Sequence, residues 1–139
     1  MDYPYIRWNA YLGQTEFLPL VDVLVRFGER ELSLPGLVDS GAWSCMMDKR
    51  LAHDLGIDLE KCQKIYVSGV GGKGQEGYVS TVRMALPDFG DHEFDTPIIF
   101  ADTPSSLLLG QADFFTNFKV TFEKQKGTFS LYPVPQLKE

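Results

Sequence analysis

The chain of 139 residues is long enough to bury one hydrophobic core, and 44% of its residues are hydrophobic while 23% are charged, the balance of an ordinary globular domain. With 13 basic and 19 acidic residues its formal net charge is −6, which repels phosphate backbones and argues against a nucleic-acid partner. We predict a single domain over 1–139, with a core at 17–132 between an N-terminal arm and a C-terminal tail at 133–139.

The N-terminal arm, residues 1–16, is aromatic and polar without a clear period, and Pro4 and Gly13 interrupt it. We therefore expect it to lie outside the core. Three roles stay open for this arm: joining a dimer interface, covering a cleft, or acting as a removable propeptide-like piece.

A strand hairpin is the first ordered element. The run of β-branched and apolar residues at 18–27, the turn at 28–30 and the segment ELSLPGLV at 31–38 predict two strands that lead into Asp39.

The rest of the chain is predicted to be mostly β. A short helix is expected from Asp48, which can cap its N-terminus, to Gly56, which suits its end. Strands are then predicted at 64–70, 78–86, 92–100, 106–109, 118–123 and 128–133, with a brief helical turn across 111–115. A glycine-dense segment, GVGGKGQEG, joins the first two as a long hairpin. The fold class is therefore all-β with one or two short helices.

The strongest local signal is LVDSGAWS at residues 37–44, where two apolar strand residues precede Asp39, Ser40 and Gly41. This pattern places a carboxylate at the end of a buried strand. An Asx-type turn explains the same triplet, because Asp, Ser and Gly are all common turn formers. The triplet alone does not establish a catalytic site.

Three motifs together, in this order and spacing, resemble the retropepsin-like aspartic proteases over about residues 17–132. The motifs are Asp39-Ser40-Gly41-Ala42, the glycine-rich Val70-Gly71-Gly72 and Leu108-Leu109-Gly110. The resemblance implies a pepsin-like or retropepsin-like closed half barrel. In that family the first motif carries the catalytic aspartate, the second forms a flap over the substrate, and the third braces the active-site loop.

The resemblance also implies roles for individual residues. Asp39 is the catalytic residue, and Ser40 and Gly41 support the catalytic loop, Ser40 through a hydroxyl expected to hydrogen-bond across a dimer axis. The residues expected to bind an extended peptide substrate are Gly41, Ala42, Val70, Gly71 and Gly72. A flexible hairpin tip explains the flap glycines equally well.

The chemistry requires a second aspartate. One carboxylate must activate water and another must protonate the leaving amide, and a pair sharing one proton does both without a cofactor or a metal. The other Asp-Thr pairs, at 95–96 and 102–103, are followed by proline, which lacks the N–H that Gly41 offers. The second carboxylate is therefore expected from Asp39 of another copy in a C₂ homodimer.

The predicted function is thus aspartic endopeptidase activity on peptide or protein substrates, with an acidic pH optimum. The alternative is a catalytically inactive, protease-like dimerisation or peptide-binding module. The C-terminal segment TFSLYPVPQLKE is a candidate interface strand, although Pro133 and Pro135 limit its pairing.

Other functional classes find weaker support. The letters GVGGKG match a dinucleotide fingerprint, but a strand follows where that motif needs a helix. Cys45 with His53 or His92 would make a thiol-protease pair, although an apolar-flanked cysteine is usually part of a core. The cysteines and histidines lack metal-ligand spacing, and no export signal or run of about 18 apolar residues is present. We expect reduced thiols in a cytoplasmic protein without a membrane partner.

Overall fold

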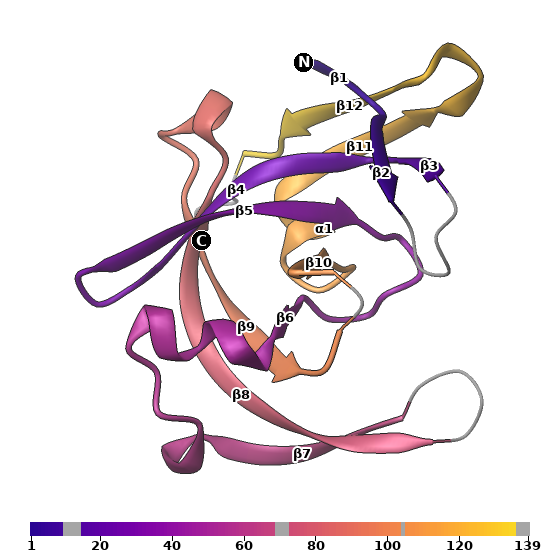
Figure 1. The fold of residues 1–139 in the computed structure, drawn as a ribbon. Helices are drawn as coiled ribbons and strands as arrows, with labels where there is room; N and C mark the ends of the chain where they lie inside the picture. The colour runs from indigo at the N-terminus through magenta and orange to yellow at the C-terminus, as the bar shows by residue number, and fades with distance from the viewer. Residues whose placement is uncertain (10–14, 69–72, 104, 136–139) are drawn as a thin grey trace.

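The computed structural model describes residues 1–9, 15–68, 73–103 and 105–135, which form mainly strands (Figure 1). The strands are β1 (Asp2–Pro4), β2 (Ile6–Asn9), β3 (Thr15–Leu18), β4 (Leu20–Phe27), β5 (Arg30–Val38), β6 (Met46–Asp48), β7 (Gln63–Ser68), β8 (Gly74–Ala85), β9 (Phe94–Ala101), β10 (Leu107–Leu109), β11 (Phe118–Glu123) and β12 (Thr128–Pro133). The helix α1 (Phe114–Asn117) and the 3₁₀ turns η2 (Lys49–Leu51), η3 (His53–Leu55), η4 (Leu59–Lys61), η5 (Pro87–Phe89) and η6 (Lys124–Lys126) connect them.

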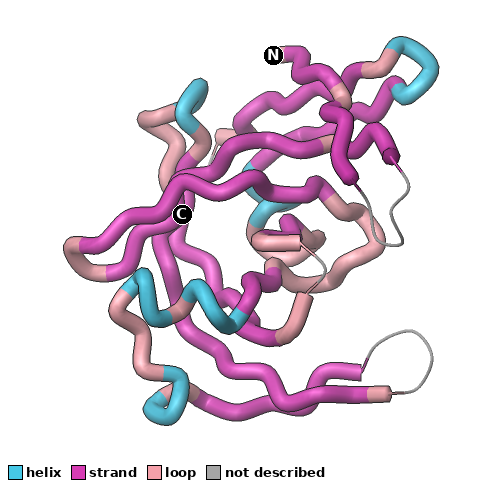
Figure 2. Tube along the Cα trace, in the orientation of Figure 1, coloured by secondary structure: helices cyan, strands magenta, loops and turns pink. Residues whose placement is uncertain are grey.

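The main sheet closes on itself. Its strands follow the order β4-β5-β10-β6-β9-β8-β7, and β4 also pairs with β8, so that β7 alone of these strands lies outside the ring (Figure 2). Most neighbours run antiparallel, but β10 runs parallel to β5 and β6 runs parallel to β9. The predicted all-β fold, with a closed sheet and few short helices, is confirmed.

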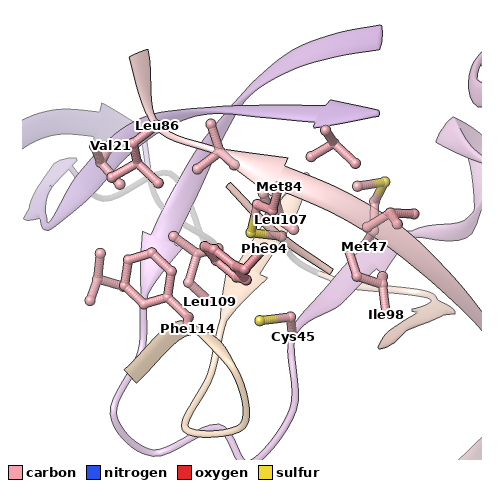
Figure 3. Close-up of a cluster of buried hydrophobic side chains, with 14 of the residues drawn as sticks. Val21, Cys45, Met47, Met84, Leu86, Phe94, Ile98, Leu107, Leu109 and Phe114 are labelled. Atoms are coloured by element: carbon pink, nitrogen blue, oxygen red, sulfur yellow. The ribbon is translucent and has the colours of Figure 1, made fainter. Parts of the chain in front are cut away.

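The core lies inside this closed sheet (Figure 3). Alternate residues of β4 and β9 are buried, as a strand with one core-facing side requires. The side chains that lose all solvent contact include Val23, Met47, Met84, Ile98, Phe100, Leu107, Leu109 and Phe114. Burying each side chain of this size contributes about 1.5–3 kcal/mol.

The N-terminal segment differs from the prediction that it is an arm outside the core. Strand β1 pairs with β12, which in turn pairs with β11, in a three-stranded sheet. The ring of Tyr3 stacks on that of Phe129 at 5.5 Å between centroids, and Tyr5 packs against the core. Strands β2 and β3 form a separate hairpin. Pairing between residues more than 120 positions apart leaves no local pattern in the sequence, which explains the error.

The helix predicted between Asp48 and Gly56 is also different in detail. Two successive 3₁₀ turns, η2 and η3, take its place. The predicted boundaries are correct, because the Asp48 side chain accepts a hydrogen bond from the Arg50 amide and Gly56 ends the segment at a φ of 73°. A segment this short gains little from α-helix propagation. Among the described residues, no helix has the length and apolarity needed to cross a membrane.

Candidate active site

Asp39 follows directly on β5, where two parallel strands end together. Val38 at the end of β5 lies opposite Leu109 at the end of β10. The Asp39 amide then donates a hydrogen bond of 3.0 Å to the Leu109 carbonyl oxygen. The closed sheet therefore fixes the position from which the Asp39 side chain projects.

The residues after Asp39 form a tight turn around its carboxylate. The Gly41 amide donates to Asp39 Oδ1 over 2.9 Å, and the Ala42 amide donates to the Asp39 carbonyl oxygen over 3.2 Å. Asp39 is half-buried, while Ser40 and Gly41 are exposed. The Asx-type turn and a catalytic placement are thus compatible, because the same amide that makes the turn points at the carboxylate.

Segment 109–112 braces this turn from one side. The Gln111 side-chain Nε2 donates to the Ser40 carbonyl oxygen over 2.7 Å. The Gln111 amide donates to the Ala42 carbonyl oxygen over 2.8 Å, and the Ala112 amide donates to that of Trp43 over 2.7 Å. The Leu108-Leu109-Gly110 motif therefore lies where a structural brace is expected, and Gln111 is a positioning residue that sequence reasoning missed.

Cys45 contacts segment 109–112 from the core side. Its buried sulfur accepts a hydrogen bond from the Gly110 amide at 3.4 Å and lies 3.8 Å from the Ala112 carbonyl oxygen. Burial raises the pKa of the Cys45 thiol, which keeps it protonated and poorly nucleophilic at neutral pH. His92 Nε2 instead contacts the Asn117 carbonyl oxygen at 3.0 Å. The contacts of Cys45 are those of a packed core residue.

The β7–β8 hairpin carries the predicted flap. Val70, Gly71 and Gly72 lie outside the described residues, but the strands on either side pair in register from Gln63↔Val79 to Ser68↔Gly74. In Figure 1 this hairpin extends away from the closed sheet in the direction in which β5 points. The hairpin itself was therefore correctly predicted.

One face of the flap hairpin continues the core-facing side of β8. Tyr78 lies opposite the buried Phe100, and strand alternation puts Tyr66, Gly74 and Glu76 on the same face. The Tyr66 side chain is 71% exposed, and its ring covers Gly74, where an added Cβ would overlap it. Tyr66 is thus an exposed aromatic side chain that packs over Gly74 on one face of the hairpin.

The other two Asp-Thr pairs lie elsewhere. Asp95, in β9, forms an ion pair with Arg83 at 3.2 Å, and its neighbour Thr96 is buried. Asp102, after β9, forms an ion pair with Lys49 at 3.6 Å. Among the described residues, no three His, Cys, Asp or Glu side chains are grouped so that they could hold a metal ion.

Comparisons with known proteins agree with this geometry. A family model described as aspartyl protease matches residues 23–112, a range that contains Asp39 and the Leu108–Gly110 brace. The structure is similar to EIAV protease in its complex with the inhibitor HBY-793, at 25% identity and a TM-score of 0.55, covering 69% of this chain and 84% of that one. No curated protein sequence matches the chain.

A second solved structure extends the likeness over more of the chain. The retropepsin-like aspartic protease from Rickettsia conorii has 16% identity and a TM-score of 0.65, and the match covers 94% of this chain and 89% of that one. At this identity the match establishes the fold alone.

Proposed function

The chain belongs to the aspartyl protease family and has the retropepsin-like fold, and from this premise we propose that it is an aspartic endopeptidase whose active site forms when two copies associate. The observation that carries the proposal is the placement of Asp39. Its carboxylate stands at the joined ends of β5 and β10, accepts the Gly41 amide, and belongs to a loop whose next two residues are exposed.

The second carboxylate comes from the partner copy. Asp95 and Asp102 are engaged in ion pairs with Arg83 and Lys49, and each precedes a Thr-Pro sequence instead of Ser-Gly. A two-fold axis beside the exposed Ser40–Gly41 turn brings the two Asp39 side chains together, because a C₂ interface places identical residues opposite each other.

The reaction follows from two carboxyl groups that share one proton. The ionised Asp39 takes a proton from a water molecule, whose oxygen attacks the carbonyl carbon of the substrate peptide bond. The protonated Asp39 stabilises the developing oxyanion by donating a hydrogen bond. A proton then passes to the amide nitrogen, the C–N bond breaks, and a carboxylic acid and an amine are released. No covalent enzyme intermediate is needed.

Backbone groups hold the substrate in an extended conformation. Gly41 and Ala42 lie beside Asp39, with the Gly41 carbonyl oxygen as the proposed main-chain contact and the Ala42 backbone held by Asp39 and Gln111. Val70, Gly71 and Gly72 of the flap are the further residues proposed to bind the peptide. Main-chain hydrogen bonds of this kind add the peptide as a strand and leave sequence preference to the side-chain pockets.

The test compares wild-type protein with Asp39→Asn on a diverse peptide library from acid to neutral pH, with the mass in solution measured in parallel. We expect cleavage by wild type, strongest at acid pH, and none by Asp39→Asn at unchanged fold and mass. Asp95→Asn is the matched control, and it should retain activity because Asp95 is an exposed residue of β9. Folded, dimeric wild type that cleaves nothing would instead indicate the inactive binding module.

A further inference from the structure

The segments that adjoin Asp39 are poor in charged residues. Charged residues make up 23% of the chain, yet none occurs in three segments that pair with β5 or follow Asp39, FLPLV at 17–21, SGAWSCMM at 40–47 and LLLGQA at 107–112. A charge close to a two-fold axis meets its own copy and is repelled. The absence of charge in these segments therefore suits contact with a second copy of the chain.

Large apolar side chains are exposed on the same segments. Trp43 is 79% exposed and Phe17 is 57% exposed, and only Tyr66 among the described large hydrophobic residues lies between these two values. Trp43 is four positions after Asp39, in the loop that Ala112 braces through the Trp43 carbonyl oxygen. A fixed backbone that presents an indole to solvent is typical of an interface anchor.

The β2–β3 hairpin, which carries Phe17, is attached next to the catalytic residue. The carbonyl oxygen of Pro19, immediately after β3, accepts a 3.0 Å hydrogen bond from the amide of Val38, the residue before Asp39. Leu18 pairs with Ile6 across the hairpin. Strand β3 therefore ends beside the backbone of the residue that precedes Asp39.

We propose that Trp43 of each copy packs against the β2–β3 hairpin of its partner, at the face that carries Phe17, and that these contacts are the apolar anchors of the homodimer. The inference rests on the proposed shared active site. In a two-fold arrangement that joins the two Asp39 side chains and seats each Trp43 on the partner's hairpin, reciprocal burial removes two indoles and two phenyl rings from water. The β2–β3 hairpin thereby acquires a role in assembly.

Trp43 itself reports this contact. The chain has two tryptophans, so Trp8→Phe in an Asp39→Asn background leaves Trp43 as the single indole in a protein that cannot digest itself. As the protein concentration rises, Trp43 emission should shift to the blue and its quenching by acrylamide should fall, in step with the rise in mass measured by sedimentation equilibrium.

Substitutions then locate the contact. Trp43→Ala and Phe17→Ser should each raise the dimer dissociation constant at least about thirtyfold, the effect of removing an interface anchor, while Trp43→Phe should recover most of the affinity. Phe27→Ala is the matched control, because Phe27 is also partly exposed but pairs with Arg30 at the turn of the β4–β5 hairpin, at the opposite end of β5 from Asp39. Circular dichroism melts establish that each variant is folded.

The outcomes separate this inference from the proposed function. An active dimer whose dissociation constant is unchanged by Trp43→Ala would overturn the anchor and leave the shared site intact. A blue shift of Trp43 on addition of a peptide substrate, at constant monomer mass, would overturn it by making Trp43 a substrate contact. A protein that stays monomeric at all concentrations and cleaves nothing would overturn the proposed function first.

Discussion

Gly110 lies so close to Ser44 that a Cβ atom built on Gly110 would be 2.6 Å from the Ser44 carbonyl oxygen and 2.8 Å from that of Ala42. Both neighbours are backbone atoms, which cannot rotate away as a side chain can. The close approach of segment 109–112 to the Asp39 loop therefore depends on the absence of a side chain at this position.

Gly110→Ala should push segment 109–112 away from the Asp39 loop. We expect the free energy of unfolding to fall by about 1–3 kcal/mol, as for overpacking elsewhere, and peptidase activity to fall more than the loss of stability explains. Denaturant titration and activity assays on folded protein measure the two effects. Gly90→Ala is the control, since the new Cβ would lie 4.0 Å from its nearest neighbour, the Pro87 carbonyl oxygen. Equal losses in both variants would refute the account.

Tyr66, an exposed aromatic side chain of the flap hairpin, should affect catalytic efficiency. Tyr66→Ala removes an aromatic surface that is 71% exposed, and we expect kcat/KM for peptides with large apolar side chains to fall about two- to tenfold, the value of an aromatic contact. Tyr66→Phe should keep the efficiency. Tyr132→Ala is a control at an exposed tyrosine of β12, and unchanged peptide kinetics in Tyr66→Ala would show that this face does not meet the substrate.

Asp48 should make the stability of the fold depend on pH. Hydrogen bonds from the Arg50 side chain, with further contributions from its amide and charge, lower the pKa of Asp48 in the folded protein. Because the pKa of Asp48 is lower in the folded than in the unfolded protein, its ionised carboxylate stabilises the fold. This stabilisation is fully present above the unfolded-state pKa of about 4, and it is lost as the pH falls through the folded-state pKa. Asp48→Ala should therefore cost about 1 kcal/mol at neutral pH, the value of an N-cap, and less in acid.

The comparison for this prediction is Asp54→Ala, at an exposed position of the neighbouring turn η3. Chemical unfolding at neutral pH and at a pH below the unfolded pKa gives the two free energies for each variant. A cost of Asp48→Ala that is the same at both pH values would contradict the assignment.

Thiol reagents should distinguish carboxylate from cysteine chemistry. Cys45 is buried, whereas Cys62 is partly exposed. Iodoacetamide should therefore modify Cys62 first in the native protein, with Cys45 reacting only when the fold opens, and peptidase activity should persist through the first modification. Mass spectrometry of digested samples identifies the modified residue. Inactivation that follows Cys45 labelling in folded protein would favour the thiol mechanism.

The strands of the closed sheet could be predicted from the sequence better than the edges of the fold. The strands that lead to Asp39, and strands β11 and β12, follow from alternating and β-branched patterns that act locally. Asp39 and Leu108–Gly110 could be proposed as site residues from the sequence because each motif occupies a short continuous stretch. Strands β1 and β6 were missed, since each has only three residues and its pairing depends on segments distant in the chain.

The contacts that shape the site could not be predicted in the same way. Gln111 was assigned only to a helical turn, and its hydrogen bond to Ser40 spans 71 positions. The exposure of Trp43 likewise depends on how its loop is fixed by Ala112. A tryptophan in a sequence is usually interpreted as a core residue. The fold shows that Trp43 faces solvent.

A subunit-mixing experiment tests the central claim, a catalytic site shared by two Asp39 residues, most directly. Wild-type protein is allowed to exchange subunits with increasing amounts of Asp39→Asn at constant total concentration, and peptide cleavage is measured at each mole fraction. If each site needs one Asp39 from each copy, activity follows the square of the wild-type fraction, so an equal mixture retains about one quarter of the activity. Activity directly proportional to the amount of wild-type protein would show that each chain works alone and would contradict the account.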